Sequence, residues 1–261
     1  NHTGSGYANE ADYFTPRGRP QPGLSVPLDA PRPDGSRYTN GRGVLFGSSG
    51  LAGVWAEENT RESIFDAFRR KETFATTGPR MRVRFFAGYD YTDDLPTDPE
   101  MVAAAYDGGV AMGGDLVAPG DRTPRFLVWA MRDPTSAPLK RLQIVKGWIE
   151  EGETRERVYD VACSDGLAVD PTTHRCPENG ATVDLTDCGI SQDAGDAELL
   201  TLWSDPEFDA SERAFYYVRA LENPPCRWTT WDAIRAGVEP RPDTPATLQE
   251  RAWSSPIWVT P

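Results

Sequence analysis

Four cysteines carry the most readable chemistry in this chain: Cys163, Cys176, Cys188 and Cys226. Each lies in a polar, turn-rich stretch, and none belongs to the Cys-x-x-Cys pairs that zinc sites use. Their even number favours two disulfides over reduced thiols or a metal site. Of the three possible connectivities, we expect Cys163–Cys176 and Cys188–Cys226. Disulfides in turn predict a periplasmic or extracellular location.

Histidine, the commonest protein ligand of catalytic metals, is scarce, since the chain has only His2 and His174. A hydrolytic metal centre built from this chain alone would depend almost wholly on carboxylates. His174 lies among turn residues, which favours an exposed loop position. The chain has no nucleophile elbow, P-loop or dinucleotide-binding glycine motif.

Two adjacent carboxylates, Glu57 and Glu58, directly follow an apolar run at residues 51–56. If that run is a parallel barrel strand, both lie at its carboxyl end, the face on which such barrels build their active sites. We therefore consider Glu57 and Glu58 as candidate catalytic residues. The alternative is that both acids only complement the dipole of the helix that follows.

Residues 44–80 predict a β-α-β unit. The run 51–56 predicts a buried strand, and 72–77 predicts a second one ended by Gly78-Pro79. Between them, Asn59 and Glu62 have the spacing of a helix capping box. The expected apolar face of this helix comprises Ile64, Phe65, Ala67 and Phe68. Such a unit is typical of parallel sheets and barrels.

Residues 81–261 predict a mainly antiparallel β-sandwich, because short strands follow one another with turn signals and almost no helix between them. The expected strands are 81–85, 125–131, 141–149, 156–162, 197–203, 214–221 and 256–259, with one short helix near 230–236. The expected core comprises Phe85, Phe126, Val128, Ile144, Trp203, Tyr216 and Val218. Residues 1–43 fit neither strand nor helix, so we expect an irregular segment laid across a larger catalytic barrel.

Charge and hydropathy exclude two classes of partner. Lys and Arg number 27 against 40 Asp and Glu, a net charge of −13, which disfavours sequence-independent nucleic-acid binding. No apolar run approaches the roughly 20 residues of a membrane span. The start at Asn1 without a Met suggests a processed or truncated piece of a longer protein.

Several strings along the chain resemble a known family when taken together. In order, they are NHTGSGY, GLAGVWAEENTRESIFDAFRRKETFATTGPRMRVRFF, GGDL, RLQIVKGW, VYDVACSDG, LWSDPEFD, AFYYVRALENPPCRW and ERAWSSPIW. They resemble the C-terminal part of a bacterial family catalogued as domain of unknown function 3604, and the resemblance covers nearly the whole chain. Family members are much longer, and their N-terminal part resembles the PHP metal-dependent hydrolases, which have a distorted β/α barrel.

The resemblance implies that residues 1–80 end a PHP-like catalytic barrel and that residues 81–261 are an appended β-sandwich. A late barrel strand of the family ends in a Ser-Asp-Asn-His type motif, whose Asp and His look like metal ligands. His2 matches that histidine, so the resemblance implies that His2 binds a divalent metal (zinc, manganese or iron) held mainly by residues outside this chain. The implied partner is the N-terminal portion of the same precursor.

The function expected from this resemblance is that of a C-terminal fragment of a secreted or periplasmic metal-dependent hydrolase, acting on a small-molecule phosphoester. Glu57 and Glu58 would lie at the barrel mouth, and Arg80, just beyond Gly78-Pro79, is a weaker candidate for holding a substrate anion. The alternative is a non-catalytic sandwich that binds carbohydrate or protein through exposed aromatics such as Trp228 and Trp231.

Overall fold

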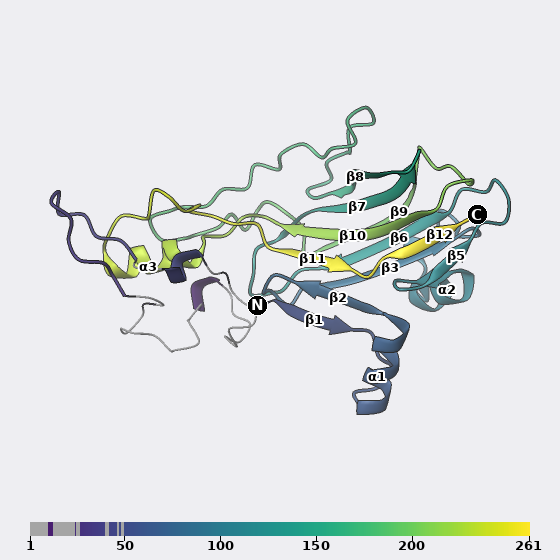
Figure 1. The fold of residues 1–261 in the computed structure, drawn as a ribbon, viewed down its shortest axis with the longest axis horizontal. Coiled ribbons are helices and arrows are strands. Elements are labelled where there is room, and N and C mark those ends of the chain that lie inside the picture. Colours follow the sequence, from purple (N-terminus) through teal and green to yellow (C-terminus); the bar gives the residue numbers. More distant parts are fainter. Residues whose placement is uncertain (1–9, 13–23, 25–26, 40–41, 46, 48–49) are drawn as a thin grey trace.

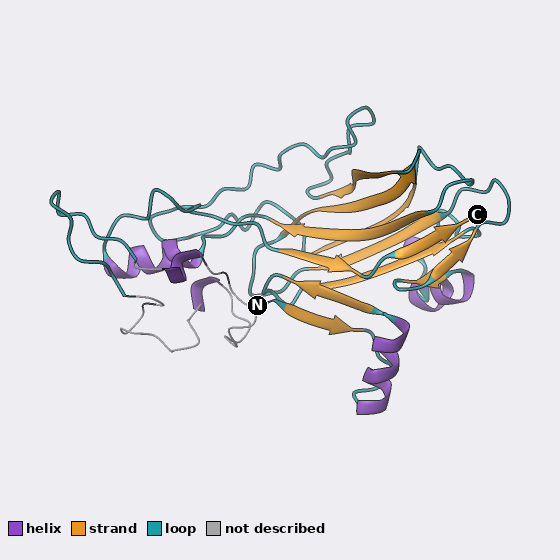
Figure 2. Ribbon diagram, viewed as in Figure 1, coloured by secondary structure: helices purple, strands orange, loops and turns teal. Residues whose placement is uncertain are grey.

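Two facing β-sheets dominate the described part of the chain (Figures 1 and 2). The computed structural model describes residues 10–12, 24, 27–39, 42–45, 47 and 50–261. Buried side chains from both sheets meet in one apolar core, so the mainly antiparallel β-sandwich expected from sequence is confirmed.

The larger sheet contains β1 (Leu51–Val54), β2 (Thr73–Thr76), β5 (Asp115–Val117), β7 (Leu139–Glu150), β8 (Glu153–Cys163), β10 (Ala214–Glu222), β11 (Arg251–Ser254) and β12 (Ile257–Thr260). The strand β10 is central to it. Along one edge β10 pairs with β7 and along the other with β12 and then β11, which are separated by Ser255-Pro256. All these pairings are antiparallel, whereas β12 pairs with β5 in parallel.

The smaller sheet has the order β4-β3-β6-β9 and is antiparallel. Its strands are β3 (Arg82–Gly88), β4 (Val110–Ala111), β6 (Arg125–Met131) and β9 (Glu198–Ser204). Alternate side chains of β3 and β6 enter the core, as the period of two predicts. Of the expected core residues, Phe85, Phe126, Val128, Ile144, Tyr216 and Val218 are fully buried, and Trp203 is partly buried against them.

Three α-helices lie outside the sheets in the described chain: α1 (Arg61–Arg70), α2 (Met101–Gly108) and α3 (Trp228–Ala236). Short 3-10 turns occur at Glu10–Asp12, Arg42–Leu45 and Leu95–Thr97. The helix α2 covers the outer face of the smaller sheet, where Met101 and Ala105 pack with Phe86 and Leu127. Sequence analysis missed α2, because its N-cap residue, Glu100, is not one of the preferred capping residues and makes no side-chain cap.

The expected parallel β-α-β unit is wrong. The strands β1 and β2 flank α1 as expected, but they pair antiparallel, with Leu51 opposite Thr76. The strand β2 also pairs with β11, so this segment extends the larger sheet of the sandwich. We call residues 51–76, which form β1, α1 and β2, the α1 arm.

The helix of the α1 arm begins one residue later than the capping pattern predicts. Thr60, not Asn59, is the N-cap, and its side chain accepts a hydrogen bond from the Ser63 N–H at 3.3 Å. Of the expected apolar face only Ala67 is buried, whereas Phe65 is 61% exposed and Phe68 is 50% exposed. Figure 1 shows why: α1 projects away from both sheets.

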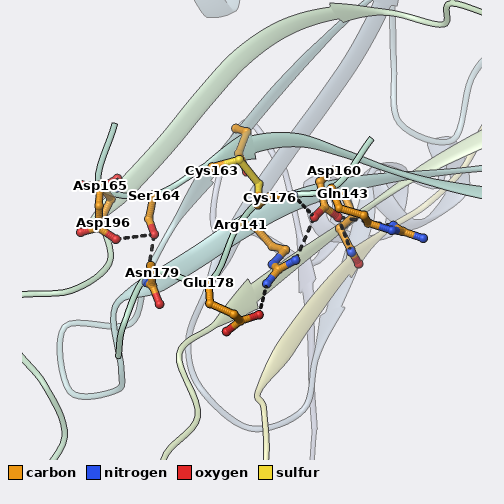
Figure 3. The surroundings of a disulfide bond; sticks show 12 residues. Arg141, Gln143, Asp160, Cys163, Ser164, Asp165, Cys176, Glu178, Asn179 and Asp196 are labelled. Atoms are coloured by element: carbon orange, nitrogen blue, oxygen red, sulfur yellow. Dashed lines mark hydrogen bonds and ion pairs between the residues drawn. A yellow bond between two sulfur atoms is a disulfide. The ribbon is translucent and has the colours of Figure 1, made fainter. Parts of the chain in front are cut away.

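Both disulfides have the expected pairing, Cys163–Cys176 and Cys188–Cys226. The first ties the end of β8 to the loop that follows it, beside the buried carboxylate of Asp160 (Figure 3). That carboxylate accepts hydrogen bonds from Arg141 at 2.8 Å, Gln143 at 2.6 Å and the Cys176 N–H at 2.7 Å. The disulfide is thus fixed to β7 as well as to β8.

The described residues between 10 and 45 contact α3 and its flanks. The Trp228 N–H donates to Glu10 Oε2 at 2.6 Å, Arg235 donates to the Ala11 carbonyl at 2.5 Å, and Arg227 donates to the Val44 carbonyl at 2.7 Å. Most of residues 1–23 lie outside the described part. The prediction that residues 1–43 cross a catalytic barrel therefore stays a prediction.

Candidate functional site

A cleft of about 700 Å³ opens where the α1 arm meets the smaller sheet and α2. Its walls come from the segment after β1, the C-terminus of α1, the strand β3 and the residues around β4. Trp55, Glu57, Arg70, Glu72, Arg84 and Tyr106 bring the polar and aromatic groups to it. We call it the arginine cleft. Its volume lies within the range of small-molecule sites.

Arg84 is held in this cleft by stacking rather than by an ion pair. Its guanidinium carbon lies 3.7 Å from the centre of the Trp55 ring, a cation–π contact. The Trp55 indole N–H donates to the Val83 carbonyl at 2.8 Å, which fixes the ring on β3. Among the described residues Arg84 has no carboxylate within ion-pair distance.

Glu72 is the buried carboxylate of the cleft, and both of its oxygens are engaged. Oε2 accepts from Arg70 Nε at 3.1 Å, and Oε1 accepts from the Tyr106 hydroxyl. Arg84 Nη1 in turn donates to the Tyr106 hydroxyl at 3.3 Å. Burial raises the pKa of Tyr106, and the neighbouring Glu72 raises it further. The phenol therefore stays protonated near neutral pH and links Glu72 to Arg84.

A close backbone contact sets the position of α1 beside the cleft. Gly113 has φ +89°, and a Cβ there would lie 2.5 Å from the Lys71 carbonyl oxygen. Only glycine tolerates this combination of left-handed φ and close approach. Its N–H donates to the Pro256 carbonyl at 2.9 Å, so the C-terminus of α1 is packed against a loop fixed to the larger sheet.

A second cleft of about 300 Å³ adjoins the arginine cleft and shares Trp55 and Arg84 with it. Arg82, Trp129 and Met131 also line it. Arg82 and Arg84 are two residues apart on β3, so both point to the outer face of the smaller sheet. In the register with β6, Arg84 is opposite Trp129 and Arg82 is opposite Met131.

The sequence-predicted residues are separated by the structure. Glu57 lines the arginine cleft. Glu58 does not: it is exposed, and its backbone N–H donates to Ser63 Oγ at 3.1 Å in the cap of α1. Arg80 is also exposed and lines neither cleft, and its backbone N–H donates to Asp133 Oδ2 at 2.7 Å.

The metal ligand implied by the family resemblance, His2, lies outside the described residues. Within residues 10–12, 24, 27–39, 42–45, 47 and 50–261, no three His, Cys, Asp or Glu side chains gather as a metal-ligand group. This part of the chain therefore does not by itself fit the implied divalent metal, and we derive no catalytic step through one.

Two buried glutamates, at the C-terminal end of β10 and just before β11, have raised pKa values. Burial raises the pKa of Glu222 to about 8, against the opposing effect of its hydrogen bond from Ser136. Burial likewise raises the pKa of Glu250 to about 7, although Thr77 donates to its carboxylate. Glu222 Oε1 has no hydrogen-bond partner in the described structure. These groups bear on stability, as considered below.

Sequence reasoning missed Arg84, Glu72 and Tyr106, because they lie in three separate places along the chain: on β3, between α1 and β2, and on α2. The alternation of Arg82, Val83, Arg84 and Phe85 was a usable signal, since it places two arginines on the solvent face of one strand. Nothing in the spacing showed that Trp55 and Tyr106 would meet them there.

The described chain contains no helix long and apolar enough to cross a membrane. Its two disulfides fit an extracellular or periplasmic location.

Comparison with known proteins gives one match. No curated protein and no solved structure matches the chain. A family model described as "Protein of unknown function (DUF3604)" matches residues 1–261, the whole sequence. The match agrees with the resemblance carried by the strings between NHTGSGY and ERAWSSPIW, and the chain therefore belongs to the DUF3604 family.

Proposed function

We propose that this chain is the C-terminal part of a secreted or periplasmic metal-dependent hydrolase that acts on a small-molecule phosphoester. In this proposal His2 contributes to a divalent metal site whose other ligands belong to the N-terminal portion of the precursor. The α1 arm packs against that portion and joins it to the sandwich. The observation that carries the proposal is the apolar face of α1, which the described part of the chain leaves uncovered.

Two features of the α1 arm support a missing partner. Phe65 and Phe68 are one helical turn apart, and at least half of each side chain is exposed. Such exposure is unusual for two neighbouring large aromatic side chains. The strand β1 is at the edge of the larger sheet and pairs only with β2 among the described strands. Uncovered strand edges are normally paired or covered in native proteins.

The positive charge around the α1 arm predicts that the partner surface is negatively charged. Residues 61–84 carry seven basic and three acidic side chains, a local net charge of +4, whereas the whole chain carries −13. A partner that covers Phe65 and Phe68 would therefore offer an apolar patch bordered by carboxylates, because complementary charge suits specific association.

The test is the double substitution Phe65→Asp/Phe68→Asp in the full-length precursor. Burying two carboxylates against the partner should detach the α1 arm from the metal-bearing portion. We expect bound divalent metal and hydrolysis of bis(4-nitrophenyl) phosphate to fall together, by tenfold or more. The same double variant of the 261-residue chain should keep its far-ultraviolet circular dichroism, because both side chains face solvent there.

Ile149→Asp provides the matched control, since Ile149 is 65% exposed at the end of β7, away from the α1 arm. This variant of the precursor should keep its metal and its activity. A precursor that retains full metal content and turnover with both phenylalanines replaced would contradict the proposal.

The second candidate is a sandwich that binds a ligand without catalysis. The expectation that Trp228 is an exposed aromatic side chain available for ligand binding is wrong, because Trp228 is fully buried. Trp231 is half-buried and lies beside Arg235, whose guanidinium carbon is 5.4 Å from the ring centre. The arginine cleft is the observation that favours this candidate instead.

A further inference from the structure

We propose that the arginine cleft and its smaller neighbour together bind an organic phosphomonoester, with the phosphate held by Arg82 and Arg84. This ligand site is carried by the 261-residue chain itself. It does not rest on the proposed hydrolase, because its binding can be measured without metal and without the precursor.

The first reason is that Arg84 is oriented but not neutralised. Trp55 holds one face of its guanidinium and the Tyr106 hydroxyl accepts from Nη1, whereas no described carboxylate pairs with it. Glu72, the buried acid that lines the same cleft, is already engaged by Arg70 and Tyr106. A guanidinium held in a fixed plane with donors to spare suits an oxyanion, because its paired N–H groups match two oxygens at once.

The second reason is the presence of two such arginines on one face of β3. Arg82 also takes part in no ion pair among the described residues, and it lines the smaller cleft beside Arg84. Residues two apart on a strand are separated by about 7 Å, so both guanidinium groups can reach one tetrahedral anion. Two positive charges favour a dianion such as a phosphomonoester over a singly charged carboxylate.

The remaining wall of the site is apolar and accounts for the organic part of the ligand. Val110, Ala111 and Met112 also line the arginine cleft. Trp129 lines the smaller cleft, with its indole N–H donated to Glu198 at 2.8 Å. A ligand with a compact aromatic or aliphatic body could therefore bury its apolar surface against these side chains while its phosphate contacts the arginines of β3.

The probe for the test is phenyl phosphate, compared with phenylacetate and with inorganic phosphate. Isothermal titration calorimetry on the 261-residue chain at about pH 8, where the phosphate is a dianion, would include EDTA so that metal plays no part. We expect saturable binding of phenyl phosphate at least about tenfold tighter than that of phenylacetate. Inorganic phosphate should bind more weakly than phenyl phosphate, because it lacks the body that fills the apolar wall.

Variants assign the binding to the cleft. Arg84→Gln should weaken phenyl phosphate binding about tenfold or more, the loss expected for a charge-assisted hydrogen bond, and Arg82→Gln somewhat less. Glu57→Gln removes a carboxylate from the same cleft and should tighten binding about twofold. Arg213→Gln, which removes an equal charge at an exposed position before β10, should leave the affinity unchanged.

Arg84→Lys is a second variant in case Arg84→Gln fails to fold, because it keeps the positive charge and loses only the planar guanidinium group. With circular dichroism like that of the unaltered chain, it too should bind phenyl phosphate more weakly. Absence of saturable binding at concentrations up to about 10 mM would overturn the proposal. Equal affinities in the Arg84 and Arg213 variants would overturn it as well, as would equal affinities for phenyl phosphate and phenylacetate.

Discussion

The sandwich and the α1 arm both contain large aromatic side chains, but they place them in opposite environments. In the sandwich, the ring centres of Phe126 and Tyr216 lie 4.5 Å apart between the two sheets, with the ring planes tilted by 38°, and both side chains are fully buried. In the α1 arm, Phe65 and Phe68 lie on a helix that projects from the sheets, and both face solvent. The sandwich therefore completes its own core, whereas the arm presents an apolar face that the rest of the described chain leaves uncovered.

The largest expected effect is loss of a core aromatic. Tyr216→Ala would remove a ring that packs on Phe126 and a hydroxyl that donates to the buried Asp205 at 2.8 Å. We expect the free energy of unfolding to fall by about 4 kcal/mol. Urea unfolding followed by tryptophan fluorescence would measure it. A loss below about 1 kcal/mol would show that this position is not part of a close-packed core.

The disulfides come next in the comparison, because neither is in the α1 arm. Cys163–Cys176 ties the end of β8 to the loop after it, and Cys188–Cys226 ties the loop between β8 and β9 to the residues just before α3. Replacing Cys188 and Cys226 by Ala opens a loop with a sequence separation of 38 and should cost about 4 kcal/mol. Replacing Cys163 and Cys176 opens one of 13 and should cost about 3 kcal/mol. Peptide mapping without reduction checks the pairing itself. Recovery of four alkylated thiols from the native protein would contradict it.

Glu222 predicts how the sandwich responds to pH. Its pKa is raised from 4.5 to about 8, so the folded state holds this proton more tightly than the unfolded chain does. Its contribution to stability is therefore present below about pH 4.5 and is lost as pH rises through about 8. Glu222→Gln should remove on the order of 3 kcal/mol of the decline between about pH 5 and 8.

Urea unfolding at both pH values would measure this decline. The control is Glu153→Gln, which removes an exposed carboxylate from β8 and should leave the pH dependence as it is in the unaltered chain. A Glu222→Gln variant with the same decline would show that Glu222 does not hold its proton in the folded state.

The two regions also differ in how much of their structure the sequence predicted. The period of two located most strands and the core of the sandwich, because each strand there has one buried face. In the α1 arm the pattern found the strands and the helix but gave the wrong pairing, since an apolar run does not tell parallel from antiparallel neighbours. The arginine cleft escaped prediction because Trp55, Glu72, Arg84 and Tyr106 meet only through the tertiary fold.

The smallest expected effect belongs to the α1 arm. Phe68→Ser in the 261-residue chain should change the free energy of unfolding by less than about 0.5 kcal/mol, because surface substitutions away from packed contacts rarely do more. The same urea experiment measures it. A loss as large as that of Tyr216→Ala would mean that Phe68 is buried in solution and that the arm has no uncovered face.

Hydrogen exchange of α1 tests the central claim, that this helix docks on the N-terminal portion of the precursor. In the 261-residue chain its amides should exchange fast, because few buried contacts hold the helix, while those of β10 should exchange slowly. In the full-length precursor we expect the α1 amides to slow by tenfold or more and those of β10 to stay as they were. Equal exchange of α1 in the chain and in the precursor would contradict the account.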